Sequence, residues 1–562
     1  DIDTVISLLN PKTKTASIRT RVIRNFKPTK RNDTMPAIGE DGESLIEEVK
    51  EFYRDNENHL IQNSTGLQWN PRTFTKLPKK TKLTPVMKRY LEFRPYVDPM
   101  TSRPLPGPDR GYYYKMMHSD VRLVRCILED NGFIEAPPGC NTWSFMWHGG
   151  CVKANVYQAM SKYQKINHFP KSYEMTRKDL MYNNLARMAT LHGSKSYSFV
   201  PKTFIMPAEA GELEFEMNSR QRTWIVKPAN SSQGKGIFLT KNFLEVPRKE
   251  MVVSEYIDNP LLINGLKFDL RIYAAITCVN PLRIYMYKEG LVRFATEKFT
   301  KKGTSRLMHL TNYSLNKFSE AFISNTDASK DDVGNKWSLS ALKRLLAKNE
   351  VDWMIVENKI KDIIIKTVLS VEGLMFSSAQ MHVPYKNNCF DLLGFDILID
   401  DNLDAWLLEV NLSPSLNCDS PLDQKIKGEM LADLFTMIGI VPIDMRKIAS
   451  SGNKNKEFNF AAYMQQIAPL ASRKKKHYSD GGKPRTADQD SMTSEERAAV
   501  KETEEELKRC GSFDRIFPSE ISINYRNFFE EERKLNTLVC NHLGKLHRKG
   551  QFIYRRAAKP VC

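Results

Sequence analysis

The chain has 562 residues, of which 41% are hydrophobic and 27% are charged, a balance typical of globular proteins. This length is enough for a large buried core and suggests roughly two to four domains. No run of about eighteen apolar residues occurs, which excludes a membrane-spanning helix, and residues 1–30 lack the apolar core of a signal peptide. The nine cysteines are odd in number and never have CxxC spacing. A disulfide framework or zinc site is therefore disfavoured, and a reducing cytosol fits.

The formal net charge of +18 and the pI of about 9.3 favour an acidic partner, which leaves nucleic acid, anionic lipid and acidic protein open. Residues 446–562 hold 24 Lys/Arg and 15 Asp/Glu, a net charge of +9, so half of the excess lies in the last fifth of the chain. This distribution predicts an appended basic region. Its run Arg473 to Lys476 is either a solvated or import-like cluster or, together with Arg548 to Lys559, a contact for an anionic surface.

The first part of the chain has little periodicity. Residues 1–110 are rich in Pro, Lys, Asn and Asp and predict an extended arm with one helix, Ser44 to Tyr53. A globular segment begins near Arg110. From about residue 197, short runs rich in Ile, Val, Tyr and Phe predict strands. These runs are Trp224 to Pro228, Met251 to Ile257, Lys267 to Val279, Leu282 to Tyr287 and Leu291 to Thr296.

The second half combines helices with a hairpin. Apolar residues with a 3.6-residue period predict helices from Ser338 to Lys348 and from Ile355 to Phe376. A hairpin follows, Phe390 to Ile399 and Ala405 to Asn411, and then a helix from Asp423 to Ile440. Residues 450–490 are predicted as a linker. Thr493 and Glu496 form a capping-box pattern before a charged helix, and a longer helix is expected from Ser519 to Arg548. The predicted fold class is mixed α/β (α+β).

The hairpin carries the sharpest chemical pattern. Glu409 and Asn411 are two residues apart on a strand and face the same side. With a turn centred on Asn402 and Leu403, Asp396 falls opposite Glu409. Three oxygen ligands without His or Cys suit Mg²⁺, which binds few carboxylates and takes its remaining oxygens from phosphate and water. The alternative is the solvent-facing side of an edge hairpin, although acids are disfavoured at strand centres.

A second pattern places cationic side chains on one strand face. Alternation puts Lys267, Asp269 and Arg271 on one side of their strand, and Arg293 lies in another short strand. Two arginines and a lysine aimed into a cleft suit phosphate or carboxylate, because the guanidinium group offers a bidentate fork. A cross-strand salt bridge on the surface is the alternative interpretation.

Two loops complete the candidate site. Residues 227–236, Lys-Pro-Ala-Asn-Ser-Ser-Gln-Gly-Lys-Gly, can lay backbone N–H groups along phosphates, but they are not a Walker A loop and a plain β-turn stays open. Residues 309–314, His-Leu-Thr-Asn-Tyr-Ser, are interpreted as a loop that lines the site because of the patterns around them, since a lone histidine is more often structural.

In series, these motifs resemble the tubulin tyrosine ligase-like family, whose fold is an ATP-grasp. The resemblance covers residues from about 120 to 441 and rests on stretches that occur in family order. They are Asn167-His-Phe-Pro, Thr176-Arg-Lys-Asp, Trp224-Ile-Val-Lys-Pro, Gln233-Gly-Lys-Gly, Lys267-Phe-Asp-Leu-Arg, Gly290-Leu-Val-Arg-Phe, His309-Leu-Thr-Asn-Tyr-Ser, Gly394-Phe-Asp and Trp406-Leu-Leu-Glu-Val-Asn.

The resemblance implies roles for matching positions. ATP and Mg²⁺ are the expected cofactors. The nucleotide would be bound by Lys227, Gln233, Gly234, Gly236, the hinge Glu255-Tyr256-Ile257, Lys267, Asp269, Thr311 and Asn312. Mg²⁺ would be bound by Asp396, Glu409 and Asn411. Arg271, Arg293 and Glu409 are the expected catalytic residues, and the two arginines would hold the incoming amino acid or the acyl phosphate.

Within the family, residues 411–415, Asn-Leu-Ser-Pro-Ser, and the basic end resemble the autonomous glutamylases. This implies an ATP-dependent ligase that adds free L-glutamate to the acidic tails of tubulin through an acyl-phosphate intermediate. A glycylase, a glutamylase with another acidic acceptor, and a non-catalytic microtubule-binding protein are the alternatives. Nucleic acid is disfavoured because no aromatic and basic RNA-binding motif is present. A monomer in the cytoplasm, on the cytoskeleton, or at a cilium or centriole is expected.

Five segments follow from this interpretation. They are an arm over 1–110, an N-terminal domain of the family over 111–222, ATP-grasp catalytic domains over 223–445, a basic linker over 446–490, and a helical, basic microtubule-binding-like extension over 491–562.

Overall fold

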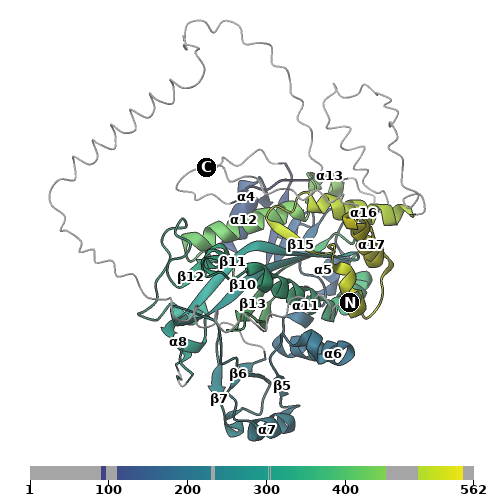
Figure 1. Ribbon diagram of the computed structural model, residues 1–562. Helices are drawn as coiled ribbons and strands as arrows, with labels where there is room; N and C mark the ends of the chain where they lie inside the picture. Colours follow the sequence, from purple (N-terminus) through teal and green to yellow (C-terminus); the bar gives the residue numbers. More distant parts are fainter. Residues whose placement is uncertain are drawn as a thin grey trace, which may run out of the picture. The chain divides into compact units, whose positions relative to one another are not determined.

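The computed structural model describes residues 90–95, 110–229, 234–301, 303, 305–450 and 492–548, which form the ribbon in Figure 1. The predicted arm helix, most of the predicted linker, Gln233 and the basic end after Arg548 lie outside these residues. None of the described helices is long and apolar enough to cross a bilayer. The eight cysteines of the described part are free thiols, in agreement with the expected absence of disulfides there.

The larger sheet has eleven strands in the described part of the chain. Its main path is β12-β11-β10-β13-β4-β3-β1-β2, and β9, β14 and β15 pair with β10, β13 and β11. The strand bounds on this path are β1 Tyr113–Met117, β2 Ile134–Glu135, β3 Phe145–His148, β4 Lys165–Asn167, β10 Leu266–Val279, β11 Leu282–Lys298, β12 Lys336–Ser338 and β13 Cys389–Ile399. The side strands are β9 Leu262–Ile263, β14 Ala405–Asn411 and β15 Phe513–Phe517.

Both faces of this sheet carry helices (Figure 1). Buried apolar residues of α4 (Arg122–Asp130) and α12 (Pro421–Met437) form one core with Tyr273 and Tyr285 of β10 and β11. On another side, α11 (Trp353–His382) contacts β10, β14 and β15. Its 30 residues correspond to a length of about 45 Å. Ser338, Asp352 and Ser420 cap the starts of α10 (Leu339–Lys348), α11 and α12, because each side chain accepts a bond from an otherwise unpaired backbone N–H.

A smaller sheet has the order β5-β8-β6-β7. Its strands are β5 Thr203–Met206, β6 Trp224–Pro228, β7 Phe238–Thr240 and β8 Met251–Glu255, and α7 (Ala210–Ser219) packs on them. Trp224 is fully buried in a separate apolar core with Phe204 and Val226. This unit therefore has a core of its own, and one of its strands, β6, leads into the Gly-containing loop after Lys227.

The remaining described elements are short or C-terminal. They are α5 Ala154–Gln158, η1 Ser172–Met175, α6 Lys178–His192, η2 Ser194–Tyr197, η3 Phe243–Glu245, α8 Arg306–His309, α9 Tyr313–Asn316, α13 Met445–Ser450, α16 Ser494–Leu507, η5 Ser522–Phe528 and α17 Lys534–Arg548.

The predicted elements of the central region are confirmed with small shifts of their ends. The strand Trp224–Pro228, the strand Ala405–Asn411 and the capping box of Thr493 and Glu496 occur as predicted. The two runs Leu282 to Tyr287 and Leu291 to Thr296 are parts of one strand, β11. Gly290 continues the strand there instead of ending it, in register with Ile272.

The predicted helix from Ser519 to Arg548 is wrong. This stretch instead contains a short 3₁₀ helix, η5, a loop at residues 529–533, and α17. The preceding strand β15, which was not predicted, pairs antiparallel with β11, from Ile284↔Phe517 to Tyr287↔Phe513. Phe513 and Phe517 pair with residues of β11 that lie more than 200 positions earlier in the chain. Local sequence patterns therefore could not predict this strand pairing.

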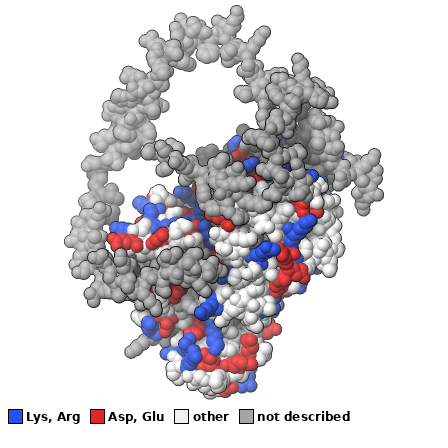
Figure 2. Space-filling view, turned by 45° about the vertical axis from the view of Figure 1, so that its right-hand side comes forward, with Lys and Arg blue, Asp and Glu red and all other residues white. Residues whose placement is uncertain are grey.

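The folded part of the C-terminal region is not basic. Residues 492–548 hold 10 Lys/Arg and 11 Asp/Glu. Figure 2 shows cationic and anionic side chains interspersed over the described part of the face in view. The positive excess of residues 446–562 therefore comes from the stretches on either side, 446–491 and 549–562. A cationic contact, if this region makes one, belongs to those stretches.

Candidate active site

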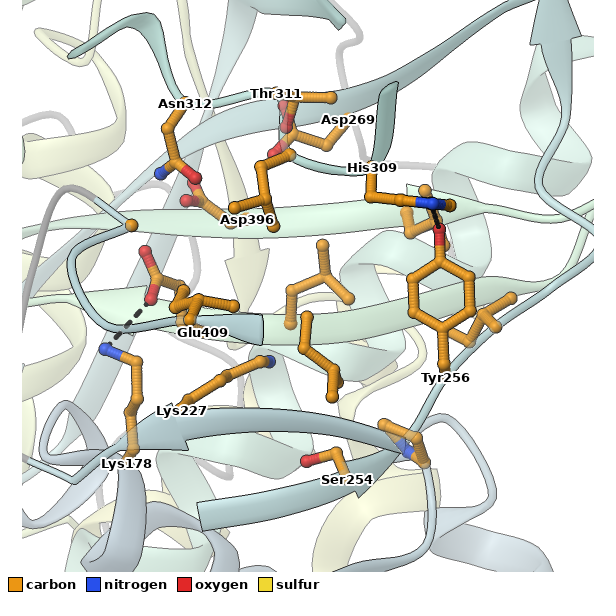
Figure 3. Close-up of a pocket in the computed structure, with 18 of the residues that line it drawn as sticks. Lys178, Lys227, Ser254, Tyr256, Asp269, His309, Thr311, Asn312, Asp396 and Glu409 are labelled. Carbon is orange, nitrogen blue, oxygen red and sulfur yellow. Dashed lines mark hydrogen bonds and ion pairs between the residues drawn. The ribbon is translucent and has the colours of Figure 1, made fainter. Parts of the chain in front are cut away.

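A cleft lies where the two sheets face each other, with a cavity volume of about 90 Å³. One wall comes from the small sheet and includes Lys227, Ser254 and Glu255. The opposite wall comes from β10, β13 and β14 of the large sheet, with the loop at residues 309–312 beside it. Figure 3 shows the result: Lys178 and Lys227 lie on one side, and Asp269, Asp396 and Glu409 lie on the other.

The two acids of the hairpin are cross-strand neighbours. Asp396 of β13 pairs in register with Glu409 of β14, as predicted. A bulge follows immediately, between Asp396 and Ile397, and it shifts the register of the rest of the hairpin. Both acids line the cleft, whereas Asn411 is not among its lining residues. Asn411 Nδ2 donates to the Gly394 carbonyl at 3.2 Å and to Glu409 Oε1 at 3.4 Å, so its amide is tied to the same pair of strands.

Two arginines, the buried Arg271 and the mostly buried Arg293, bind the carboxylates from neighbouring strands. Arg271 Nε and Nη2 donate to Asp396 Oδ1 and Oδ2 at 2.6 and 3.1 Å. Arg293 makes the same bidentate contact with Asp269, at 2.8 and 2.5 Å, and its Nη2 lies 2.8 Å from Asp396 Oδ2. Burial alone would raise the pKa of Asp396, but Arg271 and Arg293 outweigh it and hold that pKa well below its usual range. Asp396 therefore stays ionised despite its burial.

Gly394 makes the contact between Arg271 and Asp396 sterically feasible. A Cβ at this position would lie 2.8 Å from Pro414 Cβ and 3.1 Å from Arg271 Cδ. The arginine side chain thus crosses β13 where that strand has no side chain of its own. This explains why a glycine precedes the Phe395-Asp396 pair in the sequence.

Two lysines, one from each sheet, have unusual surroundings in the cleft. Lys227 and Lys267 are both more than nine-tenths buried, with 8% and 7% of their surface exposed. The pKa of Lys267 is lowered to about 7, mainly by burial. The nearby Asp269 opposes this shift, and the charge of Lys227 adds to it. Lys178, at the start of α6, lies 3.1 Å from Glu409 Oε2. A ligand with several negative charges would offset the cost of bringing these cations together.

Lys267 begins a chain of hydrogen bonds along one end of the cleft. Its Nζ donates to Tyr256 Oη at 2.9 Å, and this hydroxyl donates to His309 Nδ1 at 2.8 Å. His309 Nε2 in turn donates to the Gly303 carbonyl at 2.8 Å. Burial lowers the pKa of His309, which fits a neutral ring that accepts from Tyr256. The histidine thus orients the lysine through the tyrosine.

Gly234 brings the Gly-containing loop against the loop at residues 309–314. Its φ is +73°, and a Cβ would lie 3.1 Å from Asn312 Oδ1. Arg306 Nη2 donates to the Gly234 carbonyl at 2.6 Å. The two loops that the sequence suggested separately therefore form one side of the cleft.

Apolar side chains line the cleft between the charged groups. They come from both sheets and their connections: Pro201, Ile225, Ile237, Ile257, Leu398 and Leu408. A slot of this kind, with a few convergent polar groups, suits the flat ring of a nucleotide base. The lysines and carboxylates beyond it suit phosphates with a divalent cation.

Most predicted site residues meet in this cleft. Its lining includes Lys227, Gly234, Glu255, Tyr256, Ile257, Lys267, Asp269, Thr311, Asn312, Asp396 and Glu409. Arg271, Arg293, Gly236 and Asn411 are not among the lining residues, and Gln233 lies outside the described part. The roles assigned to all of these residues stay predictions.

Several lining residues carried no assigned role in the sequence. Lys178 belongs to a family-like stretch, Thr176 to Asp179, but it meets Glu409 only through the fold, and no local pattern links residues so far apart. Ser254, Ile225 and Leu398 belong to strands, where alternation with Lys227 or Asp396 could have indicated Ile225 and Leu398.

The residues present fit a magnesium site. No described group of three or more His, Cys, Asp and Glu forms a complete metal cage. Mg²⁺ needs no such cage, because it binds through one or two carboxylates plus substrate phosphates and water. Asp396 and Glu409 offer two carboxylates on neighbouring strands. The oxygen-only donor set agrees with a hard divalent cation and disfavours zinc.

Two sheets that face each other across lysines and paired carboxylates define the fold of an ATP-grasp ligase. The chain matches the model of the tubulin-tyrosine ligase family over residues 157–449, more than half of its length, and belongs to this family.

The relatives with curated names specify the comparison further. The chain is 40% identical over 447 residues to the human protein named tubulin polyglutamylase TTLL5, an alignment that covers 76% of this chain and 35% of that protein. It is 38% identical to mouse tubulin monoglutamylase TTLL4 over 427 residues, covering 72% and 36%. It is 38% identical to human tubulin polyglutamylase TTLL13 over 405 residues, covering 70% and 47%. The chain thus spans about a third to a half of the length of these relatives.

Proposed function

We propose that this protein is an ATP- and Mg²⁺-dependent ligase that adds L-glutamate to glutamate side chains in the acidic tails of tubulin. The observation that carries the proposal is the cleft itself, which brings the buried Lys227 and Lys267 together with the Asp396–Glu409 pair and with apolar side chains. Tubulin as the substrate is supported by the names of the relatives, which are tubulin polyglutamylases and monoglutamylases. Microtubules of the cytoplasm or of a cilium are the proposed location.

ATP would occupy the cleft with its base in the apolar slot beside Tyr256 and Ile257. Its phosphates would lie against Lys227 and Lys267, under the loop that ends in Gly234 and Gly236. Burial has already removed much of the water around these lysines, so a phosphate replaces hydration that the folded protein has lost. This preorganisation lowers the cost of charge rearrangement during phosphoryl transfer.

Asp396, Glu409 and the Asn411 amide would hold the metal ion, which neutralises charge on the phosphates. Arg271 and Arg293 keep Asp396 ionised and in place. We therefore assign them a positioning role toward the metal site, in addition to the predicted contact with the donor or the activated acceptor. Lys178, bound to Glu409, would restrain the second carboxylate.

The reaction in this proposal has two balanced steps. The γ-phosphoryl group passes from ATP to a carboxylate of the tubulin tail, which gives an acyl phosphate and ADP. The amine of free glutamate then attacks the acyl carbon, forms the amide bond and releases inorganic phosphate. The residues described here contribute charge neutralisation and alignment of the two substrates.

Attraction between opposite charges supports an acidic acceptor. The net charge of +18 raises the local concentration of acidic tails near the protein, and the excess of residues 446–562 lies in the stretches 446–491 and 549–562.

The test is mass spectrometry of tubulin tails after incubation with the protein, Mg-ATP and equimolar glutamate, glycine and tyrosine. Glutamate increments are expected, and their positions separate initiation from elongation of side chains. Glycine increments would overturn the donor but keep the ligase reaction. No increment, with an active control ligase in parallel and with Glu409→Gln equally silent, would overturn tubulin as the acceptor.

A further inference from the structure

A second cavity lies away from the cleft and has a volume of about 580 Å³. It shares no lining residue with the cleft. Along β10, Asp269 of the cleft and Thr277 of this cavity are eight residues apart, about 26 Å of strand. The cavity is enclosed by the ends of β10 and β11, the segment before β13, the end of α12, and α16 of the C-terminal region.

Two buried cations form the inner end of the cavity. Arg283 is 2% exposed and Lys165 is 8% exposed. Lys165 Nζ donates to the Asn387 carbonyl at 2.5 Å, and Arg283 Nη2 lies 3.4 Å from Asn387 Oδ1. Arg283 Nη1 donates to no atom of the described residues, although it is fully buried. An unpaired guanidinium N–H in such a place costs free energy that a bound acceptor would recover.

The cavity is lined by more cationic than anionic side chains. Its lining contains five cations, Lys162, Lys165, Arg283, Lys386 and Arg509, and three anions, Glu502, Glu505 and Glu506. Glu506 lies 3.1 Å from Arg283 and 4.0 Å from Arg509, and Glu502 lies 3.6 Å from Lys386. Lys165 forms no ion pair within the described part of the chain, and burial lowers its pKa to about 8. The lining thus has an excess of two positive charges.

The walls indicate what the ligand carries besides charge. Tyr90, Tyr163 and Tyr385 line the cavity and provide flat apolar surfaces with polar tips. A volume of about 580 Å³ lies within the range of sites for small organic ligands and exceeds what a free inorganic ion needs. The three glutamates disfavour a ligand with many negative charges, because they would repel it.

We propose that this cavity binds a phosphate monoester of a small ring-containing metabolite. A phosphate monoester carries close to two negative charges at neutral pH and so matches the excess of the lining. Its oxygens would accept from Lys165, while the charge of the neighbouring Arg283 guanidinium attracts them, as cationic groups commonly do for phosphate. A bound ligand would also link α16 to the sheet and stabilise the folded chain.

The experiment is isothermal titration calorimetry of the full chain at pH 7.5 and physiological salt, with phenyl phosphate as the probe. One site is expected, with a dissociation constant below about 1 mM and with binding roughly tenfold weaker for phenyl sulfate, which has one charge less. Inorganic phosphate forms a separate arm: binding as tight as that of phenyl phosphate would show that the ring contributes nothing and would overturn the organic part of the proposal.

The variants Lys165→Met and Lys162→Gln test the location. Lys165→Met is expected to weaken the binding of phenyl phosphate roughly tenfold. Lys162→Gln is expected to weaken it roughly a few-fold. Lys162 is exposed, so this substitution should keep the fold intact. Lys241→Gln, an exposed lysine on the small sheet's side, and Glu409→Gln in the cleft are the controls and should bind as the wild type does. Three results would each overturn the site. They are no binding of phenyl phosphate to the wild type, wild-type affinity in both cavity variants, and competition by a non-hydrolysable ATP analogue.

Discussion

Arg271 and Asp396 face each other across the paired strands β10 and β13, and both carboxylate oxygens accept from the guanidinium group. A bidentate pair of this kind, nine-tenths buried on both sides, sets the orientation of Asp396 before any metal or nucleotide arrives. The candidate metal site thus depends on a residue that does not line the cleft.

Replacement of Arg271 by Met should destabilise the protein by about 3–5 kcal/mol, because it leaves the buried Asp396 with Arg293 as its remaining charged partner. The free energy of unfolding in urea measures this. Arg526→Met is the matched control, since the pair of Arg526 with Glu532 is exposed and such pairs contribute less than about 1 kcal/mol. A loss for Arg271→Met as small as that of the control would contradict the positioning role.

Glu409→Gln should lower turnover more than about a hundredfold, because it removes a charge at the metal site and preserves the shape of the side chain. Microtubule binding should change little. Phosphate release from ATP in the presence of tubulin and glutamate measures turnover, and Glu320→Gln, at an exposed position outside the cleft, is the control. Full activity of Glu409→Gln would count against the metal assignment.

Lys267 should make nucleotide binding depend on pH. Its pKa is about 7 in the folded chain and about 10.4 in an unfolded one, so the unfolded state binds more protons between these values and stability falls as pH decreases through this window. Bound phosphates favour the charged lysine and raise its pKa. Affinity for a non-hydrolysable ATP analogue should therefore decrease as pH rises from about 6.5 to 8.5.

Calorimetry in buffers of different ionisation enthalpy should detect proton uptake on nucleotide binding above pH 7 or so. Lys267→Met should bind the analogue more weakly and take up fewer protons. The prediction fails if the variant keeps the proton uptake of the wild type.

Truncation after residue 450 should destabilise the fold rather than only weaken a microtubule contact. It removes β15 from the edge of β11 and leaves Glu372, 2% exposed, without Arg533, which donates to it at 2.8 and 3.1 Å. The soluble yield and the thermal unfolding midpoint should both drop sharply. Truncation after residue 548 is the control and should leave the soluble yield and the unfolding midpoint unchanged. The same yield and midpoint for both truncated chains would refute the structural role of residues 492–548.

Neutralisation of the run Arg473 to Lys476 tests the cationic contact without this loss of fold. Four Gln substitutions should weaken co-sedimentation with microtubules several-fold at low salt and less at high salt, because salt screens exposed charges. Lys501→Gln combined with Lys508→Gln, in the folded and nearly neutral part, should have a smaller effect. Unchanged co-sedimentation of the first variant would place the contact elsewhere.

Local patterns predicted much of the candidate site. Alternation on β10 placed Lys267 and Asp269 on one face, and both line the cleft. The hairpin from Phe390 to Asn411 was predicted with Asp396 opposite Glu409, as its register confirms. Such predictions succeed because the two-residue period of a strand and the length of a tight turn are properties of neighbouring residues.

Sequence by itself therefore determined the mixed α/β class, the family and most of the polar side chains that line the cleft. Only the tertiary structure decided that Arg271 and Arg293 bind the carboxylates across neighbouring strands, that Lys178 reaches Glu409, and that β15 completes the large sheet. The physical reason is distance along the chain. These contacts join residues separated by 24 to more than 200 positions, and their free energy depends on burial and packing that the whole fold creates.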